Sequence, residues 1–159
     1  MLNFKQKTHF MNYIISKWDK RFFEHAEHIS KWSKDKNRQV GCVISNEDNI
    51  IMSVGYNGFP RGTNDDDFPE RYERPLKYVW SEHAEKNAIY NAAREGTKLK
   101  DCNLYCTYFP CVDCCKAIIQ VGINKIYAPE PDFTHETYGE SWKVGLEMLN
   151  ECGIKTIYI

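Results

Sequence analysis

Two short segments of the sequence carry side chains that could bind a metal ion and move protons. Residues 82–85 read Glu-His-Ala-Glu, and residues 109–114 read Phe-Pro-Cys-Val-Asp-Cys. Two cysteines three positions apart at a helix start can direct both sulfur atoms at one ion, and a histidine from a neighbouring helix supplies a third ligand. Three protein ligands leave one tetrahedral position free, as in catalytic zinc sites, whereas structural zinc sites use four. The pattern predicts a zinc site formed by His83, Cys111 and Cys114.

Glu85 is the candidate for proton transfer. It follows His83 by two residues at the start of the same predicted helix, where its carboxylate can approach the metal without being a ligand. A carboxylate in that position can accept a proton and return it, which is general acid–base catalysis. The alternative interpretation of the whole group is a core histidine with buried small thiols.

Two other features of the sequence contain side chains that could bind a metal ion. Cys115 directly follows Cys114 and could be a fourth ligand, but successive side chains on a helix diverge by about 100°, so Cys115 is expected in the core. Residues 24–27 repeat the Glu-His-Ala-Glu tetrapeptide without a cysteine pair, so we expect a solvated helix face there. The remaining cysteines lie in apolar patterns and are also expected in the core: Cys42, Cys102, Cys106 and Cys152.

Hydrophobic spacing predicts the elements that must position these side chains. Helices are predicted at residues 18–33, 83–94, 112–121 and 142–151, the last three ended by Gly96, Gly122 and Gly153. Strands are predicted at residues 40–45, 50–55, 102–107, 125–128 and 155–159. The first two strands form an antiparallel hairpin, and a strand, helix, strand order at the end makes the last two parallel. We expect one α/β domain over residues 1–159, a three-layer α/β/α arrangement with a mixed five-stranded sheet.

Composition places the chain among globular proteins and limits its partners. Of its 159 residues, 42% are hydrophobic and 27% charged, and a net charge of -1 gives no field to attract nucleic-acid phosphates. No apolar run approaches the roughly 20 residues of a membrane span, and the first ten residues lack the apolar stretch of a signal peptide. Seven cysteines, an odd number, then indicate a reducing, cytoplasmic location where clustered cysteines more often serve metals or catalysis than disulfides.

Residues 56–81 show no clear periodicity, and a loop this long inside a compact domain is usually functional. The segment offers glycine amides and Arg61 for phosphate groups, and three aspartates at positions 65–67 as hard oxygen ligands. A solvated loop tip explains the aspartates equally well. For the basic residues Arg61, Lys77 and Arg94, structural salt bridges are the favoured role.

The two metal-site segments also carry a resemblance to a known family. His83 and Glu85 match the H-x-E part, and Pro110, Cys111 and Cys114 the P-C-x-x-C part, of the signature of zinc-dependent cytidine and deoxycytidylate deaminases. The chain most resembles the dCMP deaminases in its segments at residues 33–35, 39–41, 55–62, 83–89 and 118–123. The resemblance implies a cytidine deaminase-like fold, a Zn2+ cofactor and hydrolysis of dCMP to dUMP and ammonia, which feeds thymidylate synthesis.

The resemblance further implies roles for individual residues. Zinc would be bound by His83, Cys111 and Cys114, with Glu85 as the catalytic acid and base. Asn57 would reach the sugar or base of the substrate, and phosphate recognition is placed near Lys36 and Arg38, for which a solvated charge pair is the alternative. Many family members are hexamers that dCTP with Mg2+ activates and dTTP inhibits, so we expect a homo-oligomer with effector contacts at Gly55, Tyr56, Gly58 and Arg61.

Two other functions stay open at this stage. The chain could be another deaminase of the same superfamily, acting on a tRNA adenosine, a free nucleoside or another cytosine nucleotide. A tRNA substrate is disfavoured by the near-neutral charge of the chain and by residues 55–62, which resemble the dCMP deaminases. It could instead be a non-catalytic, zinc-stabilised nucleotide-binding module, which a fourth protein ligand such as Cys115 or Cys106 would indicate.

Overall fold

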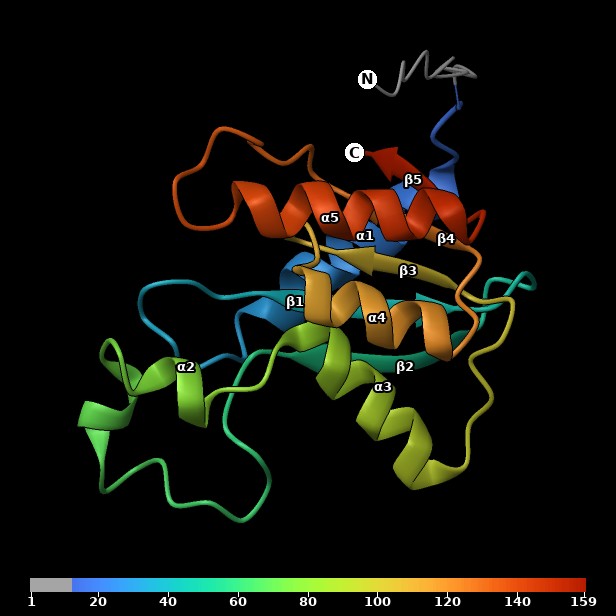
Figure 1. Ribbon diagram of the computed structural model, residues 1–159. Helices are drawn as coiled ribbons and strands as arrows, with labels where there is room; N and C mark the ends of the chain where they lie inside the picture. The colour runs from blue at the N-terminus through green and yellow to red at the C-terminus, as the bar shows by residue number, and fades with distance from the viewer. Residues whose placement is uncertain (1–12) are drawn as a thin grey trace.

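The computed structural model describes residues 13–159, which form a mixed five-stranded sheet between layers of helices (Figure 1). The strands are β1 (Gly41–Ser45), β2 (Ile51–Tyr56), β3 (Asn103–Cys106), β4 (Lys125–Ala128) and β5 (Lys155–Tyr158). The first ten residues, considered above for a signal peptide, lie outside the described residues.

The strand order is β2-β1-β3-β4-β5. β1 pairs antiparallel with both β2 and β3, while β3, β4 and β5 run parallel. The predicted hairpin and the parallel pairing of the last two strands are therefore confirmed. The structure adds β3 to the parallel group, because the helix between β3 and β4 is also a crossover.

Four longer helices cover the sheet: α1 (Lys17–Ser30), α3 (Ala84–Glu95), α4 (Val112–Gln120) and α5 (Gly139–Glu151). α1 begins with a capping box, in which Ser16 and Asp19 bond each other's backbone N–H groups. It ends three residues before the predicted boundary, and α5 begins three residues before its own. No helix within residues 13–159 is long and apolar enough to cross a membrane.

Alternation along the strands divides the core into two layers. Val43 of β1 and Tyr105 of β3 pack with Phe22 of α1 on one face. Their neighbours Cys42 and Cys106 face the larger cluster beneath α3, α4 and α5. Figure 1 shows α1 behind the sheet and α4 in front of it. The three-layer α/β/α prediction is confirmed.

The cysteine prediction holds for three of the four residues expected in the core. Cys42, Cys102 and Cys106 are buried, but Cys152 is exposed. Cys152 is the C-cap residue of α5, immediately before Gly153 with its positive φ of 72°. The chain turns away from the core there, so the apolar pattern of the helix does not extend to Cys152.

The segment between β2 and α3 contains two short helices, η1 (Pro69–Tyr72) and α2 (Lys77–Trp80), where the sequence showed no period. It is held by its own aromatic contacts. The Arg71 guanidinium lies 4.0 Å from the ring centre of Phe68 and 3.9 Å from that of Trp80. These contacts depend on side-chain identity rather than spacing, which explains why periodicity missed them.

Candidate active site

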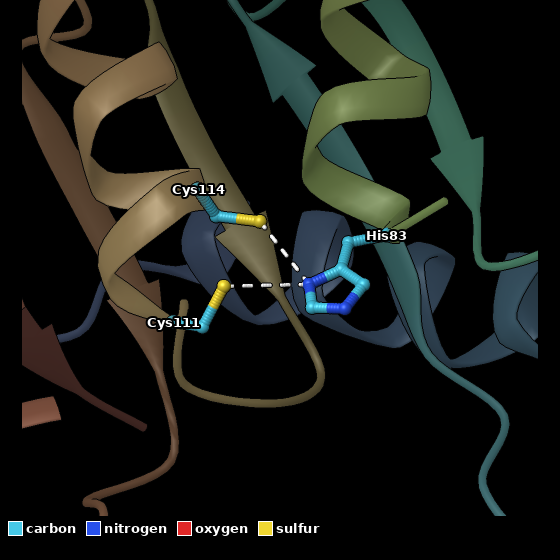
Figure 2. Close-up of side chains that lie close together, drawn as sticks. All are labelled: His83, Cys111 and Cys114. Atoms are coloured by element: carbon cyan, nitrogen blue, oxygen red, sulfur yellow. Dashed lines mark hydrogen bonds between the residues drawn. The ribbon is translucent and has the colours of Figure 1, made fainter. Parts of the chain in front are cut away.

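His83, Cys111 and Cys114 meet at the N-terminal ends of α3 and α4 (Figure 2). His83 immediately precedes α3, Cys111 immediately precedes α4, and Cys114 lies in the first turn of α4. The Nδ1 atom of His83 lies 3.4 Å from the Sγ atom of each cysteine. All three candidate ligand atoms lie within 4.8 Å of one another. The structure thus brings together the three residues that the sequence predicted as ligands.

The local backbone leaves these side chains free to converge. His83 and Cys111 are N-cap residues with extended backbone, and neither side chain caps its own helix. Both helix N-termini point their positive dipole ends at the cluster, which favours thiolate over thiol. Two sulfur atoms and one imidazole nitrogen form a donor set that zinc prefers, so the cluster fits Zn2+.

Hydrogen bonding polarises the cluster. A hydrogen bond with Cys114, assisted by one with His83, lowers the pKa of Cys111 to about 4. The hydrogen bond with Cys111 raises the pKa of His83 to about 9. The hydrogen bond between Cys111 and Cys114, together with burial, raises the pKa of Cys114. One thiolate is therefore already favoured before any cation binds, as expected of a cation site.

Cys115 points away from this cluster. Its side chain is fully buried in the core, and its Sγ donates to the Pro110 carbonyl oxygen at 3.7 Å. Burial raises the pKa of Cys115 to about 12, so it stays a neutral thiol. Within residues 13–159 no fourth protein ligand joins the three, and the repeated tetrapeptide at residues 24–27 forms no comparable group.

Glu85 lies in the first turn of α3 and is only 4% exposed. Burial raises the pKa of Glu85, and the nearby His83 charge offsets part of that shift. A carboxyl group with a raised pKa holds and releases a proton nearer to neutral pH than an exposed one does. Its place beside the cluster suits a group that moves protons and does not bind the metal.

A cavity of about 230 Å³ opens beside the cluster. His83, Glu85 and Cys111 form one part of its lining. The rest combines aromatic side chains with charged and polar groups: Tyr78, Tyr108, Phe109, Tyr138, Trp142, Asp35, Arg38, Asn57, Lys77 and Ser81. Such a lining suits a flat ring that carries polar substituents.

Of the residues proposed to bind substrate, Asn57 and Arg38 line the cavity and Lys36 does not. The Asn57 side chain accepts from the Val40 N–H at 2.8 Å and donates to the Arg38 carbonyl at 2.9 Å. The Arg38 guanidinium lies 4.2 Å from the ring centre of Tyr108. Lys36 is exposed.

The segment of residues 55–62 has structural contacts that the sequence did not predict. A Cβ atom at Gly55 would overlap the backbone of α3, so glycine permits the close approach of β2 and α3. Gly58 and Glu82 bond each other's backbone at 3.1 and 2.8 Å, which fixes the chain just before His83. The ring of Tyr56 packs edge-on against Trp32. None of the four expected effector contacts lines the cavity: Gly55, Tyr56, Gly58 and Arg61.

The three aspartates at positions 65–67 have protein partners. Lys34 Nζ lies 3.0 Å from Asp65 and 2.7 Å from Asp66. Asp67 accepts from the Asn64 amide at 2.7 Å. Lys77 forms a salt bridge, as the sequence predicted, and its partner is Asp35.

Two residues of α5 form hydrogen bonds with the backbone on either side of Cys111, and the sequence did not predict either of them. Ser141 Oγ accepts from the Val112 N–H at 3.0 Å, which satisfies a free donor of the first turn of α4. Trp142 Nε1 donates to the Phe109 carbonyl at 3.2 Å. Only the packing of α5 against α4 reveals these contacts, since 29 and 33 residues separate the partners along the chain.

Comparisons with known proteins agree with this geometry. The model of the cytidine and deoxycytidylate deaminase zinc-binding region matches residues 16–129. An uncharacterized deaminase in the luxG 3′ region of Aliivibrio fischeri is 43% identical over 92% of this chain and 96% of its own length. The human deoxycytidylate deaminase is 43% identical, over 69% of this chain and 62% of its own length.

The structural comparison points the same way. A dCMP deaminase from the cyanophage S-TIM5, solved in apo form, superimposes with a TM-score of 0.69 and 26% identity. The match covers 88% of this chain and 95% of the phage chain. The family match covers residues 16–129, and both the sheet order and the His-Cys-Cys cluster agree with it. The chain therefore belongs to the cytidine and deoxycytidylate deaminase family.

Proposed function

We propose that this protein is a zinc-dependent enzyme that hydrolyses dCMP to dUMP and ammonia. The observation that carries the proposal is a group of three candidate metal ligands beside a cavity that the buried carboxyl group of Glu85 also lines. Relatives named deoxycytidylate deaminase, such as the human enzyme, support the choice of nucleotide.

The residues of the cluster have separate roles in this reaction. His83, Cys111 and Cys114 would hold the zinc ion, which when bound lowers the pKa of a water molecule towards neutrality and so supplies a nucleophile at ordinary pH. Glu85 accepts a proton from the attacking water and delivers it to N3 of the cytosine ring. The water oxygen bonds to C4, and Glu85 then takes the remaining proton of that oxygen and delivers it to the amino group, whose bond to C4 breaks as ammonia leaves. One buried carboxyl group therefore acts as base and as acid.

Other side chains of the cavity bind and orient the nucleotide. The aromatic rings of Tyr108, Phe109 and Trp142 offer apolar surface to the base. Asn57 keeps one N–H and one lone pair beyond its two backbone bonds, and these can reach the sugar or base. Arg38 supplies a cation for the phosphate. Lys36, which is exposed and outside the lining, is the weaker phosphate candidate.

The test is to follow ammonia release from the zinc-loaded protein with cytidine, deoxycytidine, CMP, dCMP and dCTP. We expect the highest kcat/KM with dCMP. A higher value with another of these substrates would assign a different activity within the same family. Release from none of them would contradict the proposal and favour the non-catalytic module.

Regulation and assembly form a second part of the proposal, based on family resemblance. We propose a homo-oligomer that dCTP, bound together with Mg2+, activates and that dTTP inhibits. Because Lys34 already pairs with Asp65 and Asp66, Mg2+ would have to displace that lysine to use them. Superimposable hyperbolic dCMP saturation curves with and without these effectors would contradict the regulation.

The seven free cysteines support a cytoplasmic location for the protein.

A further inference from the structure

A buried ion pair in the lining of the cavity has no role in the proton transfers described above. Lys77 Nζ lies 2.7 Å from Asp35 Oδ2, and the two side chains are 11% and 3% exposed. The nearby pair of Lys34 with Asp66 is instead 53% and 83% exposed. Removing two charges from water costs free energy that their mutual attraction can fail to repay. A pair this buried is therefore poor evidence that it stabilises the fold, and a functional role for it has to be considered.

The same carboxylate fixes the backbone at Arg38. Its Oδ1 atom accepts the N–H groups of Asn37 at 2.8 Å and Arg38 at 3.2 Å. Ser33 Oγ accepts the Asp35 N–H at 3.2 Å and donates to the Asn57 carbonyl at 2.7 Å. One oxygen of Asp35 therefore holds the segment that presents Arg38 to the cavity.

The other oxygen reaches a different part of the chain. Lys77 begins α2, 42 residues after Asp35, and Tyr78 and Ser81 from the same segment also line the cavity. In the described residues the Asp35–Lys77 pair is a direct link between this segment and the one that carries Arg38. One carboxylate thus contacts both residues, Arg38 through its backbone N–H and Lys77 through its side chain.

We propose that Asp35 is a positioning residue for nucleotide binding, which holds Arg38 and Lys77 in the cavity lining so that both cations engage the anionic group of the substrate. The proposal rests on the proposed function, because it requires a pyrimidine nucleotide in this cavity. Holding two long side chains in place before binding removes part of the entropy cost that the ligand would otherwise meet.

The test measures binding of dUMP, the product, by titration calorimetry on the zinc-loaded protein, with deoxyuridine as the ligand without phosphate. Asp35→Asn keeps an oxygen for the two N–H groups and loses the charge that holds Lys77. We expect its Kd for dUMP to rise about tenfold, while that for deoxyuridine stays within about twofold. In dCMP kinetics KM should rise and kcat should stay nearly unchanged.

Lys77→Gln tests the other end of the link and should weaken dUMP binding to a similar extent. Lys34→Met is the matched control, since it removes the exposed pair nearby, and it should bind dUMP as the unmodified protein does. Zinc content and circular dichroism identify the folded variants. If Asp35→Asn does not fold, Lys77→Gln alone decides.

Three outcomes would overturn the positioning role. Unchanged or tighter dUMP binding in folded variants would show that the pair only stabilises the fold. An equal loss for dUMP and deoxyuridine would show general damage to the cavity. Absence of dUMP binding by the unmodified protein would remove the premise. Failure of the proposed function is a separate result, because it appears as lack of ammonia release from dCMP.

Discussion

Two adjacent cysteines show how strongly the direction of a side chain decides its chemistry. Cys114 Sγ lies 3.4 Å from His83 Nδ1, while Cys115 Sγ donates to the Pro110 carbonyl on the core side of α4. The turn of about 100° between successive helical residues accounts for the difference. The two residues have the same side chain. Their different directions on the helix make Cys114 a candidate ligand and Cys115 a packing residue.

Substitution of these two cysteines should give opposite results. Cys114→Ser should lose zinc, because a hydroxyl group is a poor replacement for a thiolate ligand. Cys115→Ala should keep about one zinc per chain and lose only about 1 kcal/mol of unfolding free energy through a small cavity. Elemental analysis and urea denaturation measure the two effects. Loss of zinc from Cys115→Ala alone would transfer the ligand role to Cys115.

Glu85→Gln separates proton transfer from metal binding. The variant should keep its zinc, because Glu85 is outside the three-ligand cluster. Its kcat for dCMP should fall by at least about 10² to 10⁴, which is the contribution of a positioned acid or base. Zinc content by elemental analysis and ammonia release provide the measurements. A variant that lost its zinc together with its activity would identify Glu85 as a ligand instead.

Between elements, the decisive contact is the close approach of α3 to β2. α3 begins directly after His83 and carries Glu85, so any shift of this helix moves both residues relative to Cys111 and Cys114. Gly55 allows the helix backbone to lie against the strand. The Gly58–Glu82 backbone bonds then fix the entry into the helix.

Gly55→Ala should therefore displace α3. The added methyl group would overlap the backbone of Ala84 and Ala88, and overpacking of this kind costs about 1 to 3 kcal/mol of unfolding free energy. Gly58→Ala is the matched control, since the nearest atom to its Cβ would be 3.8 Å away. Urea denaturation should show a loss for Gly55→Ala and almost none for Gly58→Ala. Equal stability of the two variants would contradict the packing argument.

Across the whole molecule, a buried network on the opposite face ties α1 to the sheet. Asp19 accepts from the Tyr105 hydroxyl at 2.9 Å and from the Ser16 N–H at 2.8 Å. Burial raises the pKa of Asp19, but hydrogen bonds from Ser16 and Tyr105 outweigh it and hold the pKa below its ordinary value. The ionised carboxylate is therefore favoured in the folded state.

This shift makes stability depend on pH in a defined direction. Because the folded pKa lies below the unfolded value of about 3.9, the contribution of Asp19 is complete above that value and is lost as pH falls through the folded pKa. Asp19→Asn should be less stable than the unmodified protein at neutral pH, and the difference should shrink in acid. Urea denaturation across this range measures it, with the exposed Glu24→Gln on the same helix as control. A difference that stays constant with pH would contradict the role of the charge.

Much of the fold and the centre of the site could be predicted from the sequence, because both depend on local patterns. The five strands lie within two residues of their predicted boundaries, since β-rich runs bounded by turns mark them. The grouping of His83, Cys111 and Cys114 as candidate ligands could be predicted because each lies within one turn of a helix start, where spacing determines direction. Helix ends were less certain, and α5 begins at Gly139 rather than at residue 142.

The tertiary structure alone decided which distant side chains share the cavity. Asp35 pairs with Lys77 across 42 residues, and Ser141 satisfies the Val112 N–H across 29. Asn57, predicted from resemblance to contact substrate, also proves to hold the backbone of Arg38 and Val40. Periodicity reports which face of an element is apolar but does not specify which polar groups meet when elements pack. The contact between Ser141 and Val112, for example, forms only when α5 packs against α4.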